Sequence, residues 1–147
     1  GEESQEQVTN RLQIQSEAGG VADSGDEIDA IVLNVKAAPG AGTIDLTAVT
    51  IRYLGPDGAV DYVSEKADDS AANFRTSTIL DESDNPALLD DQSDRMRLTL
   101  TLGGGPHASP LGEGETATLQ VNTESGGESI VRVAVPDSLS DASVVDL

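Results

Sequence analysis

Cysteine and tryptophan are absent from this chain of 147 residues, and its aromatic side chains are limited to Phe74, Tyr53 and Tyr62. Without cysteine, neither disulfides nor thiolate-bound metals contribute, which excludes a disulfide-stapled secreted module. Because aromatics are so few, the core must be built from Val, Ile, Leu and Ala, and no platform exists on which sugars or bases could stack. No stretch approaches the roughly 20 apolar residues of a membrane-spanning helix.

Positive charge is also scarce. Asp and Glu number 27 against 8 Lys and Arg, so the formal net charge is -19, and only Lys36 and Lys66 are lysines. A field of this sign repels nucleic acids and anionic membranes, so we expect neither as a partner. Two explanations remain open. The surface is typical of a protein that works in multimolar salt, where self-repulsion is screened within a few ångströms, or it binds cations.

Short runs of alternating apolar and polar residues recur along the chain, separated by Gly, Pro, Asp and Ser. In residues 28–37, Ile31, Leu33 and Val35 share one face, which is the period of a half-buried strand. The run 95–102 alternates Arg and Thr with apolar side chains that we expect to face the core: Met96, Leu98, Leu100 and Leu102. This period of two predicts a sheet with one wet face.

The residues Gly55-Pro56-Asp57-Gly58 form a strong turn signal and predict a β-hairpin over residues 48–63. Further strands are predicted near residues 73–80, 116–123 and 128–135, with a short one at the C-terminal end. Residues 67–73, 81–94 and 103–114 are predicted to be surface loops. The expected fold is all-β: an immunoglobulin-like sandwich or barrel of about seven to eight strands, with a short N-terminal helical remnant.

Few residues of the chain are candidates for catalysis. His107 is the only histidine, and its Gly/Pro-rich loop offers neither a nucleophile nor an orienting partner nearby in sequence. We therefore expect a solvated loop histidine, and the serines lie in no Gly-x-Ser-x-Gly elbow. Twenty-seven acids make chance carboxylate pairs inevitable. We predict no catalytic residues, no cofactor-binding residues, no enzymatic activity and no small-molecule substrate.

The densest acidic cluster lies within residues 81–94. Its members are Asp81, Glu82, Asp84, Asp90, Asp91 and Asp94. Clustered carboxylates can supply several of the six to eight oxygens that Ca²⁺ takes, but this spacing differs from that of the EF-hand loop. In a chain this acidic such clusters arise without a site, so we assign no metal ligands and retain a divalent cation such as calcium only as an alternative.

The first residues, 1–14, are polar up to Gln7, and Val8 and Leu12 then stand at a helical spacing while Leu12 and Ile14 stand at a strand spacing. This pattern indicates the end of a longer helix running into the first strand. The predicted organisation is therefore residues 1–12 as helix end and linker, followed by a single β-sandwich domain over residues 13–147.

These stretches resemble an archaeal flagellin (archaellin) across essentially the whole chain. The resemblance is carried by GEESQEQVTNRLQI, by IDAIVLNVKAAPGAGTIDLTAVTIRYL and by VRVAVPDSL. It implies an outer β-domain, facing the medium outside the cell, that lacks the hydrophobic N-terminal helix through which such subunits polymerise with copies of themselves and with paralogues. The acidic surface suits a haloarchaeal source. One departure is that many archaellins carry Asn-x-Ser/Thr glycosylation acceptors, whereas this chain has none.

The resemblance leaves alternatives open. Minor components of the same motor and pilin-like extracellular adhesion or binding modules share the plan of a helix followed by a β-domain. We expect the isolated domain to be monomeric, because its polar start offers no apolar stripe for packing against neighbours.

Overall fold

The computed structural model describes residues 11–68, 70–80, 88–89, 93–140 and 142–147. The predicted helix end and linker cover residues 1–12, of which only residues 11 and 12 belong to the described part. Strands and one short 3-10 helix make up the secondary structure of the described part: β1 (Leu12–Val21), β2 (Glu27–Ala37), β3 (Ile44–Asp45), η1 (Leu46–Ala48), β4 (Thr50–Gly55), β5 (Gly58–Ser64), β6 (Asn73–Leu80), β7 (Leu88–Leu89), β8 (Arg95–Thr101), β9 (Leu111–Gly112), β10 (Thr116–Asn122), β11 (Glu128–Ala134) and β12 (Val144–Asp146).

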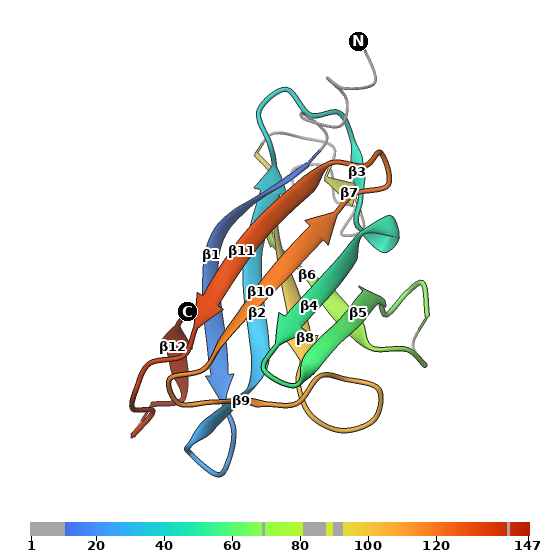
Figure 1. Ribbon diagram of the computed structural model, residues 1–147. Helices are drawn as coiled ribbons and strands as arrows, with labels where there is room; N and C mark the ends of the chain where they lie inside the picture. The colour runs from blue at the N-terminus through green and yellow to red at the C-terminus, as the bar shows by residue number, and fades with distance from the viewer. Residues whose placement is uncertain (1–10, 69, 81–87, 90–92, 141) are drawn as a thin grey trace.

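Ten strands form one curled sheet in the order β11-β10-β4-β5-β6-β8-β2-β1-β12, with β9 paired to β2. Figure 1 shows β11, β10, β4 and β5 in front of β8, β2 and β1, so the sheet folds over on itself into two layers. The β5–β6 pairing between the layers is parallel and joins only two residue pairs, whereas the other pairings are antiparallel. On the opposite side the Ser129 hydroxyl of β11 donates to the Leu12 carbonyl of β1, so the two layers also meet there.

The predicted all-β fold is confirmed. In the described part of the chain, the eight strands of six residues or more agree with the expected seven to eight, and the additional β3, β7, β9 and β12 have only two or three residues each. The short C-terminal strand was predicted and is β12, whereas β3, β7 and β9 have only two residues each and cannot display an alternating pattern. Among the described residues, no helix is long and apolar enough to cross a membrane.

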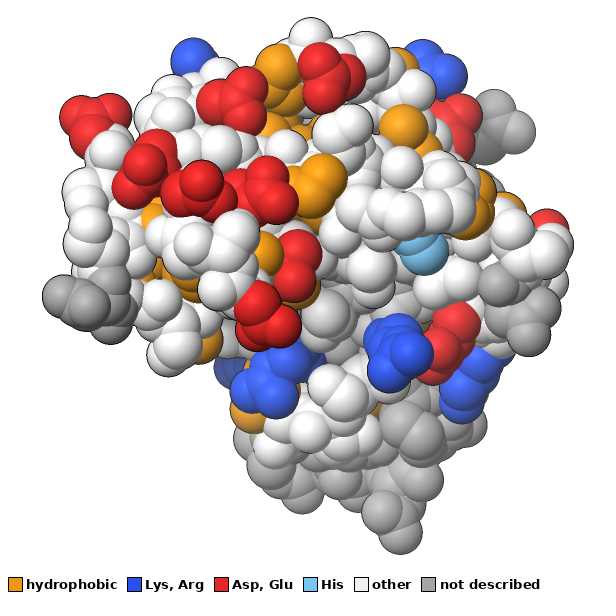
Figure 2. All heavy atoms as spheres, turned by 90° about the horizontal axis from the view of Figure 1, so that it is seen from below, with side chains coloured by type: hydrophobic (Ala, Val, Ile, Leu, Met, Phe, Trp, Pro, Cys, Tyr) orange, Lys and Arg blue, Asp and Glu red, His pale blue; other side chains and the backbone are white. Residues whose placement is uncertain are grey.

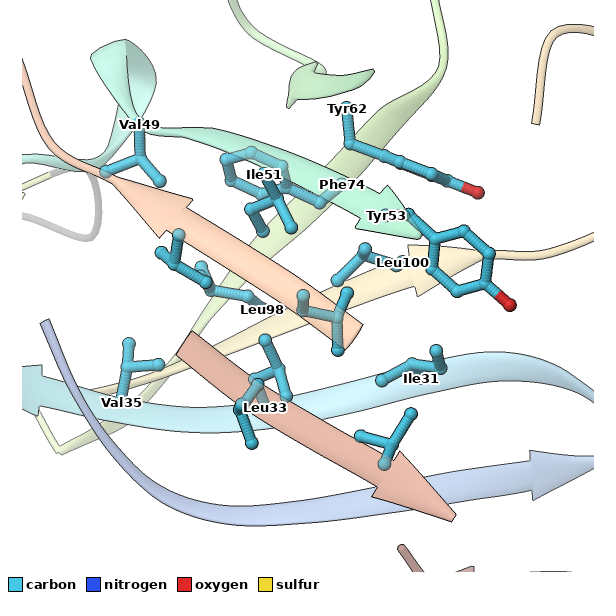
Figure 3. Packing of buried hydrophobic residues seen from close by; sticks show 14 of the residues in the cluster. Ile31, Leu33, Val35, Val49, Ile51, Tyr53, Tyr62, Phe74, Leu98 and Leu100 are labelled. Atoms are coloured by element: carbon cyan, nitrogen blue, oxygen red, sulfur yellow. The ribbon is translucent and has the colours of Figure 1, made fainter. Parts of the chain in front are cut away.

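The inner faces of the two layers form a single core. Met96, Leu98 and Leu100 of β8 are fully buried and Leu102 nearly so, as the alternation predicts. Leu98 and Leu100 stand opposite Leu33 and Ile31 of the neighbouring strand β2. Figure 3 shows these side chains packing against Ile51 of the other layer. Aliphatic side chains dominate this core because the chain has so few aromatics.

Two predicted surface loops are partly buried, which corrects the sequence-based expectation. Within residues 103–114, Ala108 and Leu111 are buried, and Leu111 pairs with Ile28 of β2. Within residues 81–94, Leu89 is fully buried and its strand β7 pairs with β3. Residues 81–87 and 90–92 lie outside the described part of the chain.

Candidate functional surfaces

The alternation that buries one face of each strand exposes the other, and the exposed face of the rear layer is basic. The strand pairing defines two of its cross-strand rows. Ser77, Arg97, Asn34 and Ser16 lie side by side in one row, and Arg75, Thr99, Val32 and Ala18 in the next. We call the outward residues of β6, β8, β2 and β1 in this region the basic face: Arg75, Ser77, Arg95, Arg97, Thr99, Thr101, Ala30, Val32, Asn34, Lys36, Gln13, Ser16, Ala18 and Gly20.

The basic face contains four of the chain's eight basic residues and no acidic one. Small residues occupy part of it, since Val32 stands opposite Ala18 and Ala30 opposite Gly20. Arg75 forms an ion pair with Glu65, with 3.5 Å between Nε and Oε2. Asp146 of β12 pairs with Ala18 and marks the edge of the face.

The outer face of the front layer is electrically balanced. Its charged side chains are Arg52, Asp61, Arg132 and Glu128. Arg52 Nε lies 2.9 Å from Asp61 Oδ1 across the β4–β5 hairpin. This hydrogen-bonded pair lowers the pKa of the Asp61 carboxyl and raises the pKa of Arg52. The exposed Ile130 and Leu54 give the same face some apolar area.

Negative charge gathers at the end of the sandwich where β1 turns into β2. Glu27 pairs with Gly112, which places this turn beside residues 113–115, and Gly114 N donates to the Pro136 carbonyl, which adds residues 136–139. We call the acids on these segments the acidic end: Asp23, Asp26, Glu27, Asp29, Glu113, Glu115 and Asp137. Figure 2 views the molecule from this end and shows red side chains gathered over part of it, apart from most of the blue ones.

Two of these acids also accept hydrogen bonds from backbone amides. Glu115 Oε1 accepts from Gly112 N at 2.6 Å, and Glu113 Oε2 accepts from Leu139 N at 2.6 Å. Asp23, Asp26 and Asp137 are exposed to solvent. The acidic end is therefore a cluster of acidic side chains, three of them exposed to solvent and two of them hydrogen-bonded to the backbone.

Tyr62 connects the core to residues 103–114 at the same end of the sandwich. Its hydroxyl donates to the Thr101 carbonyl at 2.7 Å and accepts from Ala108 N at 3.0 Å. Burial raises the pKa of Tyr62, while the bond from Ala108 acts in the opposite direction. Both hydrogen-bonding functions of the hydroxyl are thus used by the backbone of a loop that passes over the ring.

Tyr53 lies beside Tyr62 with an edge-on ring contact, at a centroid distance of 6.3 Å. Figure 3 shows both hydroxyls turned toward the same end of the core. A Cβ on Gly55 would come within 2.5 Å of the Tyr53 ring, so glycine is required where this ring crosses the hairpin. Tyr53 is only 2% exposed, yet its hydroxyl has no hydrogen-bond partner among the described residues. Burial raises its pKa.

His107 and Tyr53 line the same pocket, of about 120 Å³, between the hairpin turn and residues 107–110. His107 Nδ1 lies 3.2 Å from the Gly104 carbonyl, and its Nε2 is buried without a partner among the described residues. The expectation of a solvated histidine is therefore wrong in detail, since the ring is half-buried. Within the described part of the chain no carboxylate contacts it to orient it as a general base, so the arrangement there contains no catalytic pair of the usual kind.

Of the acidic cluster predicted within residues 81–94, only Asp94 is described, and it is fully buried. In the described part of the chain, no group of three or more His, Asp or Glu residues is arranged to hold a metal ion. The divalent cation therefore remains an alternative that the described residues do not test.

Comparison with known proteins identifies the family. A family model described as archaeal-type flagellin matches residues 1–133. Flagellin B3 of Halobacterium salinarum is 37% identical over 149 aligned residues, which cover 100% of this chain and 74% of that protein. Relatives in Haloferax volcanii and Natrialba magadii are also flagellins.

The structural comparison agrees. The crystal structure of archaeal flagellin FlaB1 from Methanocaldococcus jannaschii has a TM-score of 0.75 at 13% identity, covering 92% of this chain and 95% of that one. The archaeal flagellum of Methanospirillum hungatei has a TM-score of 0.67 at 18% identity, covering 98% and 76%. The fold is thus that of archaellin β-domains. With the sequence match, the chain belongs to the archaeal-type flagellin family. It is a structural subunit of the archaellum, located outside the cell.

The sequence identified the family but not the surfaces. The alternation in residues 95–102 already indicates that Arg95 and Arg97 point outward. What it cannot supply is the strand order that sets Arg97 beside Asn34 and brings Arg75 into the same face. The pocket beside Tyr53 was missed for a similar reason, because its two walls are about fifty residues apart in the chain.

Proposed function

We propose that this chain is the medium-facing outer domain of a major filament subunit, and that the filament assembles through a hydrophobic N-terminal helix outside these 147 residues. The observation that carries the proposal is the 37% identity to Flagellin B3 along the whole chain, which covers 74% of that longer protein. The polar run from Glu2 to Gln7 supports it, because such residues cannot pack a helix into an apolar filament core. We place the boundary between linker and outer domain near residue 12.

In this mechanism the helices supply most of the association energy, at about 25 cal/mol for each Å² of apolar area that they bury. The outer domains contribute weakly, since their net charge of -19 makes neighbouring copies repel unless salt screens them. The partners are other copies and paralogous flagellins. We propose no nucleic acid, no small-molecule substrate and no enzymatic turnover for this chain.

The test is electron microscopy of filaments from cells carrying the complete gene, compared with cells in which only the region encoding these 147 residues is expressed. We expect filaments in the first case and none in the second, with the isolated domain eluting as a monomer or weak oligomer. Filaments formed by the isolated domain would move the assembly determinants into the β-sandwich. If filaments of normal length persist when the gene is deleted, a minor component of the motor or an adhesion module becomes the better assignment.

The proposal includes a high-salt medium, and this part has a separate test. Screening shortens the reach of charge from about 10 Å at 0.1 M salt to about 3 Å at 1 M. Because 27 acids repel one another across a small domain, the unfolding midpoint should rise strongly from low salt to multimolar NaCl. Sodium sulfate at matched ionic strength and NaCl should be compared, so that screening is separated from effects on water. A midpoint that does not change with NaCl would remove the high-salt assignment.

A further inference from the structure

We infer that the outer domains of neighbouring copies dock with the basic face of one against the acidic end of the next. The inference rests on the proposed assembly into filaments and adds the contact surfaces that the outer domain uses. The inference starts from an uneven distribution of charge. The chain carries -19 overall, whereas the basic face includes Lys36, Arg75, Arg95 and Arg97, and the acids of β2, Glu27 and Asp29, lie at the acidic end of that strand.

The charge pattern selects the partner. Two copies with a net charge of -19 repel each other in most orientations, and a basic face reduces this repulsion only where it meets acids. Within the described residues, the acidic end offers Asp23, Asp26, Glu27, Asp29, Glu113, Glu115 and Asp137. No basic residue lies on the segments that form it, residues 22–29, 112–115 and 135–140. A second copy of the chain therefore presents the complementary surface.

The shape of the basic face suits close approach. Val32 and Ala18 are small and lie in the same cross-strand row as Arg75, and Ala30 and Gly20 lie in the next row, so a partner can approach the sheet closely on this side of the basic residues. The balanced front face, with the Arg52–Asp61 pair, has no comparable surplus of either sign. It therefore provides an internal control for any effect of charge.

The symmetry of the contact also fits a filament. The basic face lies on the outer side of the rear layer, while the acidic end lies at the end of the sandwich where β1 turns into β2. The two surfaces are different and occupy different parts of one molecule, so their contact is heterologous and leaves a free basic face and a free acidic end at each step. Such a contact propagates into an open helical array when its rotation does not close into a ring, whereas a pairing of identical faces would stop at a dimer.

The first arm of the test measures weak self-association of the 147-residue chain by sedimentation equilibrium in about 1 M NaCl, where long-range repulsion is screened. Arg97→Glu should weaken association roughly fivefold relative to Arg132→Glu on the front face. Both positions are exposed, and both changes alter the net charge equally. Equal effects of the two substitutions would show that only net charge matters and would overturn the inference.

A mixing experiment adds specificity. The double variant Asp26→Lys, Asp137→Lys reverses exposed acids at the acidic end, apart from the two carboxylates that fasten the backbone. This variant and Arg97→Glu should each associate weakly alone but more strongly when mixed, because the reversed face then meets a reversed end. Arg132→Glu leaves both docking surfaces intact, so mixing it with the double variant should not raise association above that of Arg132→Glu alone. A gain of the same size with both would count against the assigned face.

The second arm uses filaments and exploits the absence of cysteine from this chain. The complete protein carrying Arg97→Cys and Asp137→Cys should give a covalent ladder with a short bismaleimide, while Arg132→Cys with Asp137→Cys should not. Normal filaments without a ladder from the first pair would overturn the docking inference and leave the proposed function standing. If the unaltered complete protein forms no filaments, the proposed function fails, and the solution arm alone then decides whether the two surfaces bind.

Discussion

The inner faces of β2 and β8 and the loop over residues 103–114 hold the same sandwich together in different ways. Between the strands, the buried Leu33 stands opposite Leu98, and an apolar side chain of similar volume would bury similar area. The loop instead depends on one hydroxyl, because Tyr62 bridges the Thr101 carbonyl and Ala108 N. The strand contacts therefore tolerate apolar substitutions that conserve volume, whereas the loop contact depends on hydrogen-bond geometry.

A second contrast is between the two tyrosines that lie near this loop. Tyr62 and Tyr53 are both almost completely buried and touch edge to face, yet only the Tyr62 hydroxyl is hydrogen-bonded within the described residues. An unmade hydrogen bond in a buried site costs more than a made one contributes. The two tyrosines therefore form a matched pair, in which the same chemical deletion should have different consequences.

The largest expected effect belongs to the strand side of the comparison. Leu100→Ala removes most of a fully buried side chain near the C-terminal end of β8 and leaves a cavity in the core. We expect the free energy of unfolding to fall by about 2 to 5 kcal/mol, measured by urea unfolding at constant NaCl concentration. Thr101→Ala, at an exposed position in the same strand, is the control. A loss within about 0.5 kcal/mol would mean that the inner face is not packed as described.

Prediction from the sequence also succeeds for the long strands and fails for the loop. Alternation identified the long strands and the buried side of β8, because a period of two is a local property of the chain. It could not identify β3 and β7, whose two residues each carry no period, nor the anchoring of Ala108 by a tyrosine that lies 46 residues away. Residues 103–114 were predicted to be a surface loop because their composition is that of a turn, whatever tertiary contact they make.

The candidate contact surfaces show the same limit. Each arginine could be assigned to the outward side of its own strand, but the basic face exists only because β6, β8 and β2 are neighbours in the sheet. β8 is the neighbour of β2 in the sheet, and β6 is the neighbour of β8. In the sequence, however, β4 and β5 come between β2 and β6, and these two strands lie in the other layer. Strand order of this kind is set by packing across the whole domain and not by any local pattern.

The next effect in size tests the loop side of the comparison. Tyr62→Phe removes the bridging hydroxyl and leaves Ala108 N buried without its acceptor, so we expect a loss of about 1 to 3 kcal/mol. Hydrogen exchange should locate the damage: the amide of Ala108 should exchange faster, while amides in the centre of β8 lose protection only as much as global stability falls. Unchanged exchange at Ala108 would show that the loop does not depend on this hydroxyl.

Alkaline pH should weaken the tyrosine end without a mutation. Burial raises the pKa of both Tyr62 and Tyr53 in the folded state. Below the ordinary tyrosine pKa of about 10, folded and unfolded chains both hold these protons, and the stabilising contribution is complete. As pH rises above that value the unfolded chain ionises first, so each tyrosine lowers stability by up to about 1.4 kcal/mol per pH unit until the folded pKa is reached. Tyrosinate absorbance followed with unfolding should show a shallower fall in the variant Tyr53→Phe; an equal fall would assign the loss to other groups.

The smallest expected effect completes the matched pair. Tyr53→Phe keeps the ring that packs against Tyr62 and crosses Gly55, and it removes a hydroxyl that has no partner among the described residues. We therefore expect a change in unfolding free energy within about 0.5 kcal/mol, with any shift toward greater stability, because a buried hydroxyl without a partner is unfavourable. Urea unfolding beside Tyr62→Phe under identical salt gives the direct comparison. A loss as large as that of Tyr62→Phe would mean that the hydroxyl is bonded in solution, for example through a water in the 120 Å³ pocket that also reaches His107 Nε2. In that case His107→Ala should cause a similar loss, and the double variant should lose little more than either single one, because both substitutions would remove the same bridge.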